Sequence, residues 1–444
     1  MKNILIIAYF YPPLGGAGVQ RSLKFAKYLS KMDYNVSVLT VDSRVDVMDK
    51  SMEAEASGKI KIYRAEASAG ILERLIKSGS SKSSASENIP RGPGRSSLVK
   101  RLKKYGINLA KKVVLSIYRL VNIPDEKKGW KKNAVELGCK IIEEQKIDVI
   151  YSTSAPYTSH LIGLELKNRY KIPWICDFRD SWVADPFAVY STLAKYINGK
   201  LEKKVVEAAD RVIAVSQPII SDFIERYVHT DRSKYSVITN GYDEEDFQAY
   251  DMNKKTEKYT ITYNGTLYGN RTAKRIFKAV DNLISGGVLK RDEITLRFVG
   301  NNGRDAKEEI EEFSRQYPNV VQCINYLPHR ESIKQIEDST ALLLLIEDGP
   351  GSEGIYTGKI FEYIRSGRII IGAVPDGVAR DLISETNTGF CCYPQNISEI
   401  EEAIMKGYMI WKEKLEPLKI DFEKVYTYER EELTRQLAKL IEEL

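Results

Sequence analysis

Charged side chains follow a short apolar segment at residues 173–177, which is typical of a buried strand. Asp177 ends this segment, and Arg179 and Asp180 come directly after it. Ligands of parallel α/β sheets bind outside the carboxyl ends of the strands, so these charges are expected to face a ligand cleft. A surface ion pair is the alternative explanation of the same residues.

Residues in the second half of the chain have the chemistry needed to bind a nucleotide diphosphate. A helix N-terminus with a lysine beside it favours a phosphate, and a carboxylate one turn further on can accept hydrogen bonds from ribose hydroxyls. The sequence therefore predicts a site for a nucleotide diphosphate-sugar. The residues concerned are Gly265, Thr266, Arg271, Thr357, Gly358, Lys359 and Glu362.

A glycine-rich loop follows the first predicted strand and precedes a predicted helix at 20–29. Its residues Gly15 and Gly16 let the backbone turn tightly, and the bare N–H groups of the helix indicate an anionic or hydroxylated ligand. The loop also fits part of a dinucleotide-binding motif, although Arg21 stands where the third glycine belongs. Asp42, after the second predicted strand, can bind a ribose hydroxyl and keeps this alternative open.

Residues 354–359 resemble a phosphate-binding P-loop at first sight. Glu353 stands where that motif has its first glycine, and Ile360 replaces the hydroxyl residue that binds Mg²⁺. These two differences argue against a P-loop nucleotidase.

Predicted strands and helices alternate along the chain, which indicates βαβ units and parallel sheets. A polar stretch at 243–257 separates two series of such units. We therefore predict an α/β protein with two doubly wound, Rossmann-like domains facing a cleft. The expected N-terminal domain spans 1–242, the C-terminal domain 258–415, and a last helix in 416–444 packs back towards the N-terminal domain. The predicted strands are 4–10, 35–41, 147–152, 173–177, 211–215, 235–238, 259–264, 294–299, 320–326, 341–346, 368–373 and 389–393.

Length and composition limit the class of protein. The 444 residues are 43% hydrophobic with a net charge of +6, which is low for a dedicated nucleic-acid-binding protein, so no nucleic-acid partner is expected. The five cysteines have no metal-binding spacing and are interpreted as reduced thiols of a cytoplasmic protein. No apolar stretch has the length of a signal-peptide core or a transmembrane helix.

Two consecutive segments interrupt the alternation of strands and helices. Residues 78–97 are rich in serine and glycine and are predicted to be mobile. Residues 98–121 have apolar side chains at spacings of three and four with lysines and arginines between them, which predicts a basic amphipathic helix. Such a helix suits the anionic inner face of the plasma membrane. An ordinary domain helix with a solvated basic face is the alternative.

Taken together, these motifs resemble those of bacterial glycosyltransferases of family 4, enzymes of surface-polysaccharide synthesis with the GT-B fold. The resemblance covers nearly the whole chain outside 65–130. Each motif is loose by itself, and their order and spacing together are fairly specific. The segments that carry the resemblance are 12–16, 177–180, 209–216, 238–243, 263–267, 298–300 and 359–363.

The resemblance implies a retaining transferase that moves a sugar from a nucleotide diphosphate-sugar to a glycan or lipid-linked acceptor, without a metal ion or other cofactor. Glu362 would hold the ribose, and the backbone at Tyr326 and Leu327 would hold the base. Residues expected at the diphosphate or donor sugar are Gly15, Gly16, Gly265, Thr266, Arg271, Gly354, Thr357, Gly358 and Lys359. Residues expected to face the sugar or acceptor are Asp177, Arg179, Asp180 and His160.

Two positions depart from the pattern of that family. Thr266 stands where the family has an arginine, which removes one cation from the diphosphate site. The family also has a second glutamate earlier in the chain, separated by seven intervening residues from the one matched by Glu362. Gly354 occupies that position here, so the role falls to Glu353, one position away, or to Asp348. A nucleotide-sugar epimerase of the same architecture and a non-catalytic subunit with this fold are the alternative functions.

Overall fold

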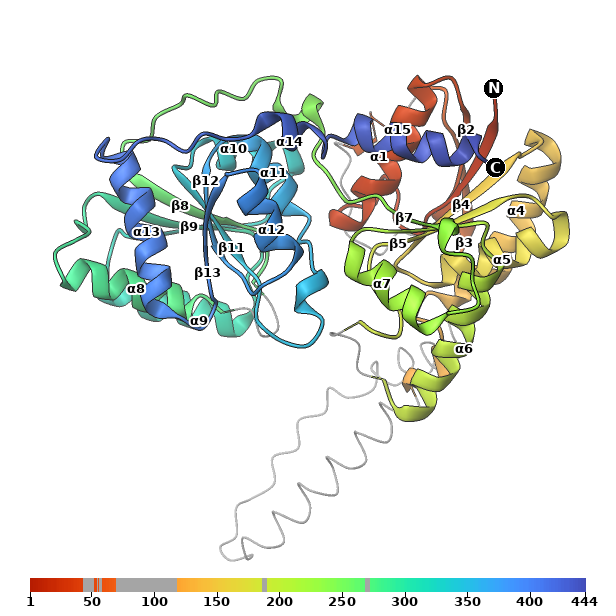
Figure 1. Ribbon diagram of the computed structural model, residues 1–444, viewed down its shortest axis with the longest axis horizontal. Coiled ribbons are helices and arrows are strands. Elements are labelled where there is room, and N and C mark those ends of the chain that lie inside the picture. Colours follow the sequence, from red (N-terminus) through yellow and green to blue (C-terminus); the bar gives the residue numbers. More distant parts are fainter. Residues whose placement is uncertain (43–51, 54, 56–57, 69–117, 186–189, 268–271) are drawn as a thin grey trace, which may run out of the picture.

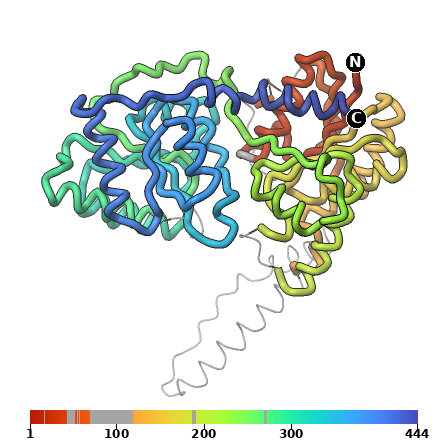
Figure 2. Tube along the Cα trace, in the orientation of Figure 1, coloured from red at the N-terminus to blue at the C-terminus, as the bar shows by residue number. Residues whose placement is uncertain are grey.

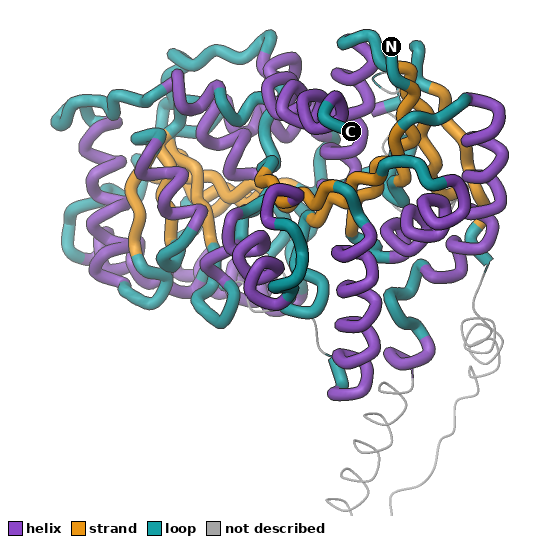
Figure 3. The backbone as a smooth tube through the Cα atoms, turned by 45° about the vertical axis from the view of Figure 1, so that its right-hand side comes forward, coloured by secondary structure: helices purple, strands orange, loops and turns teal. Residues whose placement is uncertain are grey.

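The computed structural model describes residues 1–42, 52–53, 55, 58–68, 118–185, 190–267 and 272–444. Two bodies lie side by side, each built on a parallel sheet with helices packed against it (Figures 1 and 3). Within the described residues, the N-terminal sheet has seven strands in the order β3-β2-β1-β4-β5-β6-β7. The C-terminal sheet has six strands in the order β10-β9-β8-β11-β12-β13. These sheets confirm the predicted α/β class with two doubly wound domains.

The N-terminal domain contains the first seven strands and the helices between them. Its strands are β1 (Asn3–Ile7), β2 (Asn35–Asp42), β3 (Lys61–Glu66), β4 (Val149–Ser154), β5 (Trp174–Phe178), β6 (Arg211–Ala214) and β7 (Tyr235–Val237). Its helices are α1 (Ala17–Lys31), α4 (Lys131–Gln145), α5 (Thr158–Tyr170), α6 (Thr192–Ala208) and α7 (Gln217–Arg226), with short 3₁₀ turns η2 (Lys128–Trp130) and η3 (Arg232–Lys234).

The C-terminal domain repeats this alternation. Its strands are β8 (Tyr259–Asn264), β9 (Ile294–Val299), β10 (Val321–Ile324), β11 (Ala341–Leu345), β12 (Ile369–Ala373) and β13 (Gly389–Cys392). Its helices are α8 (Lys274–Ser285), α9 (Arg304–Gln316), α10 (His329–Glu337), α11 (Lys359–Ser366), α12 (Val378–Glu385) and α13 (Ile397–Trp411). The 3₁₀ turn η4 (Glu244–Phe247) lies in the segment that joins the domains, and η5 (Ser352–Gly354) follows β11.

Helices cover both faces of each sheet, so the central strands are buried on both sides, and β11 is apolar throughout. Every residue of β4, β5 and β11 is buried. The edge strand β3 was not predicted, since it mixes charged and apolar residues and buries only Ala65.

The last part of the chain returns from the C-terminal domain to the N-terminal domain. Figure 2 shows this segment crossing between the two bodies, through α14 (Phe422–Tyr426) to α15 (Arg430–Glu442). Helix α15 lies against α1, and its side chains Leu433, Leu437 and Ile441 are part of the N-terminal core. The end of the chain is therefore built into the first domain.

Two predicted segments cannot be placed in this fold. Residues 78–97 lie outside the described residues, and so does the predicted amphipathic helix at 98–121 apart from 118–121. Among the helices that the structure describes, none is both long and apolar enough to cross a membrane.

Candidate functional site

A cleft lies between the two domains, at the carboxyl ends of the strands of both sheets. Its cavity has a volume of about 1030 Å³. Its walls come from the loop before α1, the ends of β4 and β5, the segment joining the domains, and the loops after β8 to β11. The predicted site residues in its lining are Gly16, Arg179, Asp180, Gly265, Thr266, Tyr326, Leu327, Gly354, Thr357, Gly358, Lys359 and Glu362.

Lys359 and Gly265 fit against each other on the C-terminal side of the cleft. The ammonium of Lys359 lies 3.7 Å from the centre of the Tyr263 ring. A Cβ atom added to Gly265 would lie 2.6 Å from Lys359 Nζ, and the φ angle of Gly265 is +143°. A side chain at position 265 would therefore displace the lysine. Because Lys359 begins α11, its charge lies beside the free N–H groups of that helix.

Thr357 places a buried hydroxyl just before α11. Its Oγ1 atom has no hydrogen-bond partner among the described residues, although Thr357 lines the cleft. Unpaired buried polar atoms are rare in proteins because they have lost their hydrogen bonds to water. An oxygen-rich ligand at the start of α11 would provide the missing partner.

Glu362 lies one turn into α11 and faces His329. The Oε1 atom of Glu362 is 3.8 Å from the Nε2 atom of His329. Burial raises the pKa of Glu362, and the positive charge of His329 opposes this effect. Burial also disfavours protonation of His329, but Glu362 and Asp246 together raise its pKa to about 9. The imidazole is therefore charged at neutral pH and favours the ionised Glu362, which can accept hydrogen bonds from hydroxyl groups.

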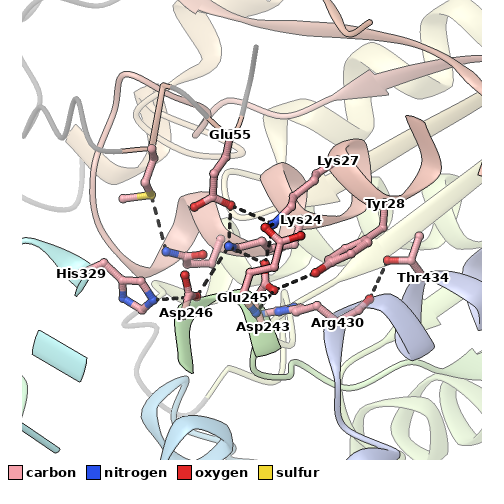
Figure 4. A network of polar contacts seen from close by, with 12 residues as sticks. Lys24, Lys27, Tyr28, Glu55, Asp243, Glu245, Asp246, His329, Arg430 and Thr434 are labelled. Carbon is pink, nitrogen blue, oxygen red and sulfur yellow. Dashed lines mark hydrogen bonds and ion pairs between the residues drawn. The ribbon is translucent and has the colours of Figure 1, made fainter. Parts of the chain in front are cut away.

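His329 belongs to a polar network that connects the two domains (Figure 4). Its Nε2 atom lies 3.1 Å from Asp246 Oδ2, in the segment that joins the domains. On the other side of that segment, Lys24 Nζ of α1 lies 3.6 Å from Asp246 and 2.6 Å from Asp243. Charged groups thus connect the first helix of the N-terminal domain to the α11 carboxylate.

Arg179 and Asp180 form part of the N-terminal wall of the cleft. Arg179 donates hydrogen bonds to the backbone oxygens of Gly18, Ser154 and Ala155. The guanidinium thereby holds the start of α1 against the end of β4. The Asp180 side chain lines the cleft, where partial removal from water raises the pKa of its carboxyl and the positive charge of Arg179 opposes that shift. Arg179 therefore shapes the wall, and Asp180 faces the cavity.

Asp177 was expected to face the cleft, but it does not line it. Its buried carboxylate accepts hydrogen bonds from Arg21 at 2.6 and 2.8 Å, from Tyr151 at 2.6 Å and from Thr153 at 2.8 Å. Burial raises the pKa of Asp177, and these bonds, led by Arg21, more than reverse this, so the pKa is lowered. Both carboxylate oxygens are used inside the domain, which gives Asp177 a structural role.

His160 is buried behind the cleft and does not line it either. Its Nδ1 atom lies 2.8 Å from Ser152 Oγ, which accepts a hydrogen bond from Trp174 Nε1 at 2.9 Å. Burial lowers the pKa of His160 to about 3, so the ring is neutral at physiological pH. Its Nε2 atom is buried and has no hydrogen-bond partner among the described residues, and the residue is not part of the cleft lining.

Some of the remaining predicted residues line the cleft and others do not. Gly15 precedes the lining residue Gly16 without lining the cleft itself, and Arg271 lies outside the described residues. Of the two carboxylates considered near the donor sugar, Glu353 lines the cleft and Asp348 does not. The described residues contain no group of three or more His, Cys, Asp or Glu side chains arranged to hold a metal ion.

The charged lining residues that the sequence analysis did not name include three basic ones, Lys24, His329 and Arg430. His329 follows the predicted base-binding loop by two residues, and that closeness was an available signal. Lys24 lies in a helix whose polar face would ordinarily meet water. Nothing in the sequence near Arg430 indicates that it lines the cleft, because its position depends on α15 returning to the N-terminal domain.

The fold and part of the sequence match known proteins. The family model for Glycosyltransferase Family 4 matches residues 93–246. No curated protein sequence matches this chain.

Solved structures resemble the chain over its whole length. Sucrose-phosphate synthase from Thermosynechococcus elongatus has 16% sequence identity and a TM-score of 0.64, covering 100% of this chain and 99% of that chain. HepE from Anabaena, solved with UDP and glucose, has 14% identity and a TM-score of 0.60, covering 100% of both chains. TarM from S. aureus, in a complex that contains UDP, has 11% identity and a TM-score of 0.61, covering 99% of this chain and 100% of that chain. These similarities show that the chain has the GT-B fold.

Proposed function

We propose that the protein is a glycosyltransferase that takes its sugar from a nucleotide diphosphate-sugar bound in the cleft. The start of α11 supports this most directly, because the unpaired hydroxyl of Thr357, the ammonium of Lys359 and the carboxylate of Glu362 come from six consecutive residues that all line the cleft or flank its lining residues. A diphosphate suits the ammonium, the hydroxyl and the helix N–H groups, and ribose hydroxyls suit the carboxylate. The match to the Glycosyltransferase Family 4 model lends independent support.

The other residues of the lining fit the parts of such a donor. In this proposal, the backbone at Tyr326 and Leu327 contacts the base, and Gly265 and Thr266 lie along the diphosphate. The donor sugar lies towards Glu353 and the N-terminal wall. HepE and TarM were solved with UDP, which makes uracil the first base to test.

The proposed reaction exchanges one bond at the anomeric carbon of the sugar for another. The bond from this carbon to the β-phosphate oxygen breaks as the bond to an acceptor hydroxyl oxygen forms. The acceptor proton passes to the leaving phosphate, so attack occurs on the face that the leaving group vacates and the configuration is retained. Negative charge grows on the diphosphate, and the fixed ammonium and N–H groups at α11 stabilise it. We propose that this positive charge removes the need for a metal ion.

The acceptor is proposed to be a glycan or a lipid-linked precursor of a surface polysaccharide at the cytoplasmic face of the membrane. The support for this part is the basic amphipathic sequence pattern of residues 98–121. Deleting these residues is expected to reduce cosedimentation with vesicles that contain anionic lipid, in a salt-sensitive manner. Equal cosedimentation of the two proteins would contradict the membrane role.

Incubation with a panel of nucleotide-sugars tests the activity. Release of a nucleoside diphosphate that depends on an added acceptor, with the anomeric configuration of the product followed by NMR, is the result expected for a retaining transferase. Conversion of the donor sugar without an acceptor would instead indicate an epimerase. Weak nucleotide binding with no turnover across the panel would indicate a non-catalytic subunit.

A further inference from the structure

Arg430 is the first residue of α15, and its side chain points from that helix towards the segment joining the domains (Figure 4). It lines the cleft and is only 6% exposed. Its Nη1 atom is buried without a hydrogen-bond partner, and its guanidinium forms no ion pair among the described residues. Because an unpaired buried cation is unfavourable, a partner from outside the protein would satisfy it.

The backbone around Arg430 is held firmly in place. Its N–H group donates to the carbonyl oxygen of Tyr242 at 2.8 Å, which attaches the start of α15 to the joining segment. The apolar side chains of Leu433, Leu437 and Ile441 then anchor the same helix in the N-terminal core. Arg430 therefore moves with the N-terminal domain, although it lies far from that domain in the sequence.

Arg430 carries a positive charge that no carboxylate of the described residues pairs with directly, so it can bind an anion. Burial and the nearby Arg21 lower its pKa to about 10, and Asp243 and Glu362 oppose this, so Arg430 is charged at neutral pH. Arg21 itself is fully engaged, since its Nε and Nη2 atoms bind Asp177. Arg430 is thus a fixed positive charge on the N-terminal side of the cleft, in electrostatic contact with the carboxylate of α11.

We propose that Arg430 binds the phosphate that is attached to the donor ribose. This inference rests on the proposed function, in which the ribose hydroxyls bind Glu362. Hydroxyls at Glu362 and a phosphate at Arg430 belong to one ligand, a nucleoside phosphate, which then connects α11 of one domain to α15 packed on the other. Arg430 also supplies a cation to a site where Thr266 carries none.

Calorimetric titration with UDP and with uridine tests this assignment in the full-length protein. Arg430→Met is expected to weaken UDP binding at least about tenfold and to leave uridine binding within about twofold, because only the charge-assisted contact to phosphate is lost. Glu362→Gln is expected to weaken both ligands by the same factor. If UDP does not bind, ADP, GDP, CDP and dTDP are tested with their nucleosides in the same way.

Arg435→Met is the matched control, since Arg435 lies on the same helix, is paired with Glu431 and does not line the cleft. Equal UDP affinity of the Arg430→Met and Arg435→Met proteins, or an equal loss for UDP and uridine in Arg430→Met, would overturn the assignment. If Arg430→Met does not fold, Arg430→Lys is compared instead, with a loss of about threefold or more expected for UDP alone. Failure of the wild-type protein to bind any nucleoside diphosphate would overturn the proposed function as well.

Discussion

Arg21 and Asp177 form an ion pair inside the N-terminal domain, with Arg21 Nη2 2.6 Å from Asp177 Oδ1 and both side chains buried. Arg21 also donates to the backbone oxygens of Ile238 and Thr239, just after β7, at 2.8 and 2.6 Å. The Arg21 guanidinium therefore connects α1 to the ends of β5 and β7. This contact holds α1, and with it the glycine loop before it, next to the cleft. Arg21 stands where a dinucleotide-binding motif has its third glycine, and the structure gives it this stabilising role instead.

Replacing Asp177 with asparagine is expected to lower the free energy of unfolding by about 3–5 kcal/mol, because Arg21 then stays buried without its counter-charge. Denaturation followed by tryptophan fluorescence measures this change, since Trp130, Trp174 and Trp182 all lie in the same domain.

The exposed pair of Lys203 and Glu207 on α6 provides the control for this measurement. Glu207→Gln is expected to change the same free energy by less than about 1 kcal/mol. A similar small change in Asp177→Asn would show that the buried pair contributes little to stability.

The fold was predictable because its central strands carry a local signal. A run such as Ala341–Leu345 is apolar throughout, which a strand covered on both faces requires. The edge strand β3 lacks this signal, since only one of its faces meets the core and its charged residues lie in water.

The candidate site was predictable only where neighbours in the sequence are also neighbours in the cleft. The residues from Thr357 to Glu362 lie at one helix start, so the chain itself brings them together. Asp177 and Asp180 lie near the same strand end, but Asp177 belongs to β5 and is buried in the domain, whereas Asp180 lies beyond the strand. No local pattern distinguishes these two carboxylates, because the difference depends on a partner, Arg21, that is remote in the sequence.

Turnover is expected to depend on Lys359 and on the space that Gly265 leaves for it. Lys359→Met is expected to reduce turnover about 100-fold, since a charge-assisted contact contributes about 1.5–3 kcal/mol. Gly265→Ala is expected to cause a loss of the same order, because its Cβ would displace Lys359 Nζ. Initial rates of nucleoside diphosphate release measure both effects.

Gly349→Ala is the control for the glycine variant, because an added Cβ there meets no atom within 4 Å and Gly349 does not line the cleft. Its rate is expected to equal that of the wild-type protein. Wild-type rates in Gly265→Ala and Lys359→Met would exclude the start of α11 from the reaction.

Removal of divalent metal ions is expected to leave transfer activity unchanged within about twofold, because Lys359 and the α11 N–H groups stabilise the leaving diphosphate in the proposed mechanism. The measurement compares initial rates in excess EDTA with rates after Mg²⁺ or Mn²⁺ is added back. Loss of activity in EDTA and its recovery with either ion would contradict this mechanism.

His329 is expected to make stability depend on pH in the neutral to alkaline range. Its pKa rises from 6.5 to about 9 in the folded protein, where Glu362 and Asp246 outweigh burial. A raised pKa stabilises the fold fully below the unfolded value, and this stabilisation is lost as the pH rises through the folded value. The free energy of unfolding should therefore exceed that of His329→Gln by up to about 3 kcal/mol near pH 6, and this excess should disappear by about pH 10.

Denaturation curves of both proteins from pH 6 to pH 10 measure this difference directly. His229→Gln, at an exposed position outside the network, is the control for the loss of a histidine. A difference between wild type and His329→Gln that stays constant over this range would mean that His329 does not carry the charge which joins Asp246 to Glu362. The network between the domains would then act through hydrogen bonds alone.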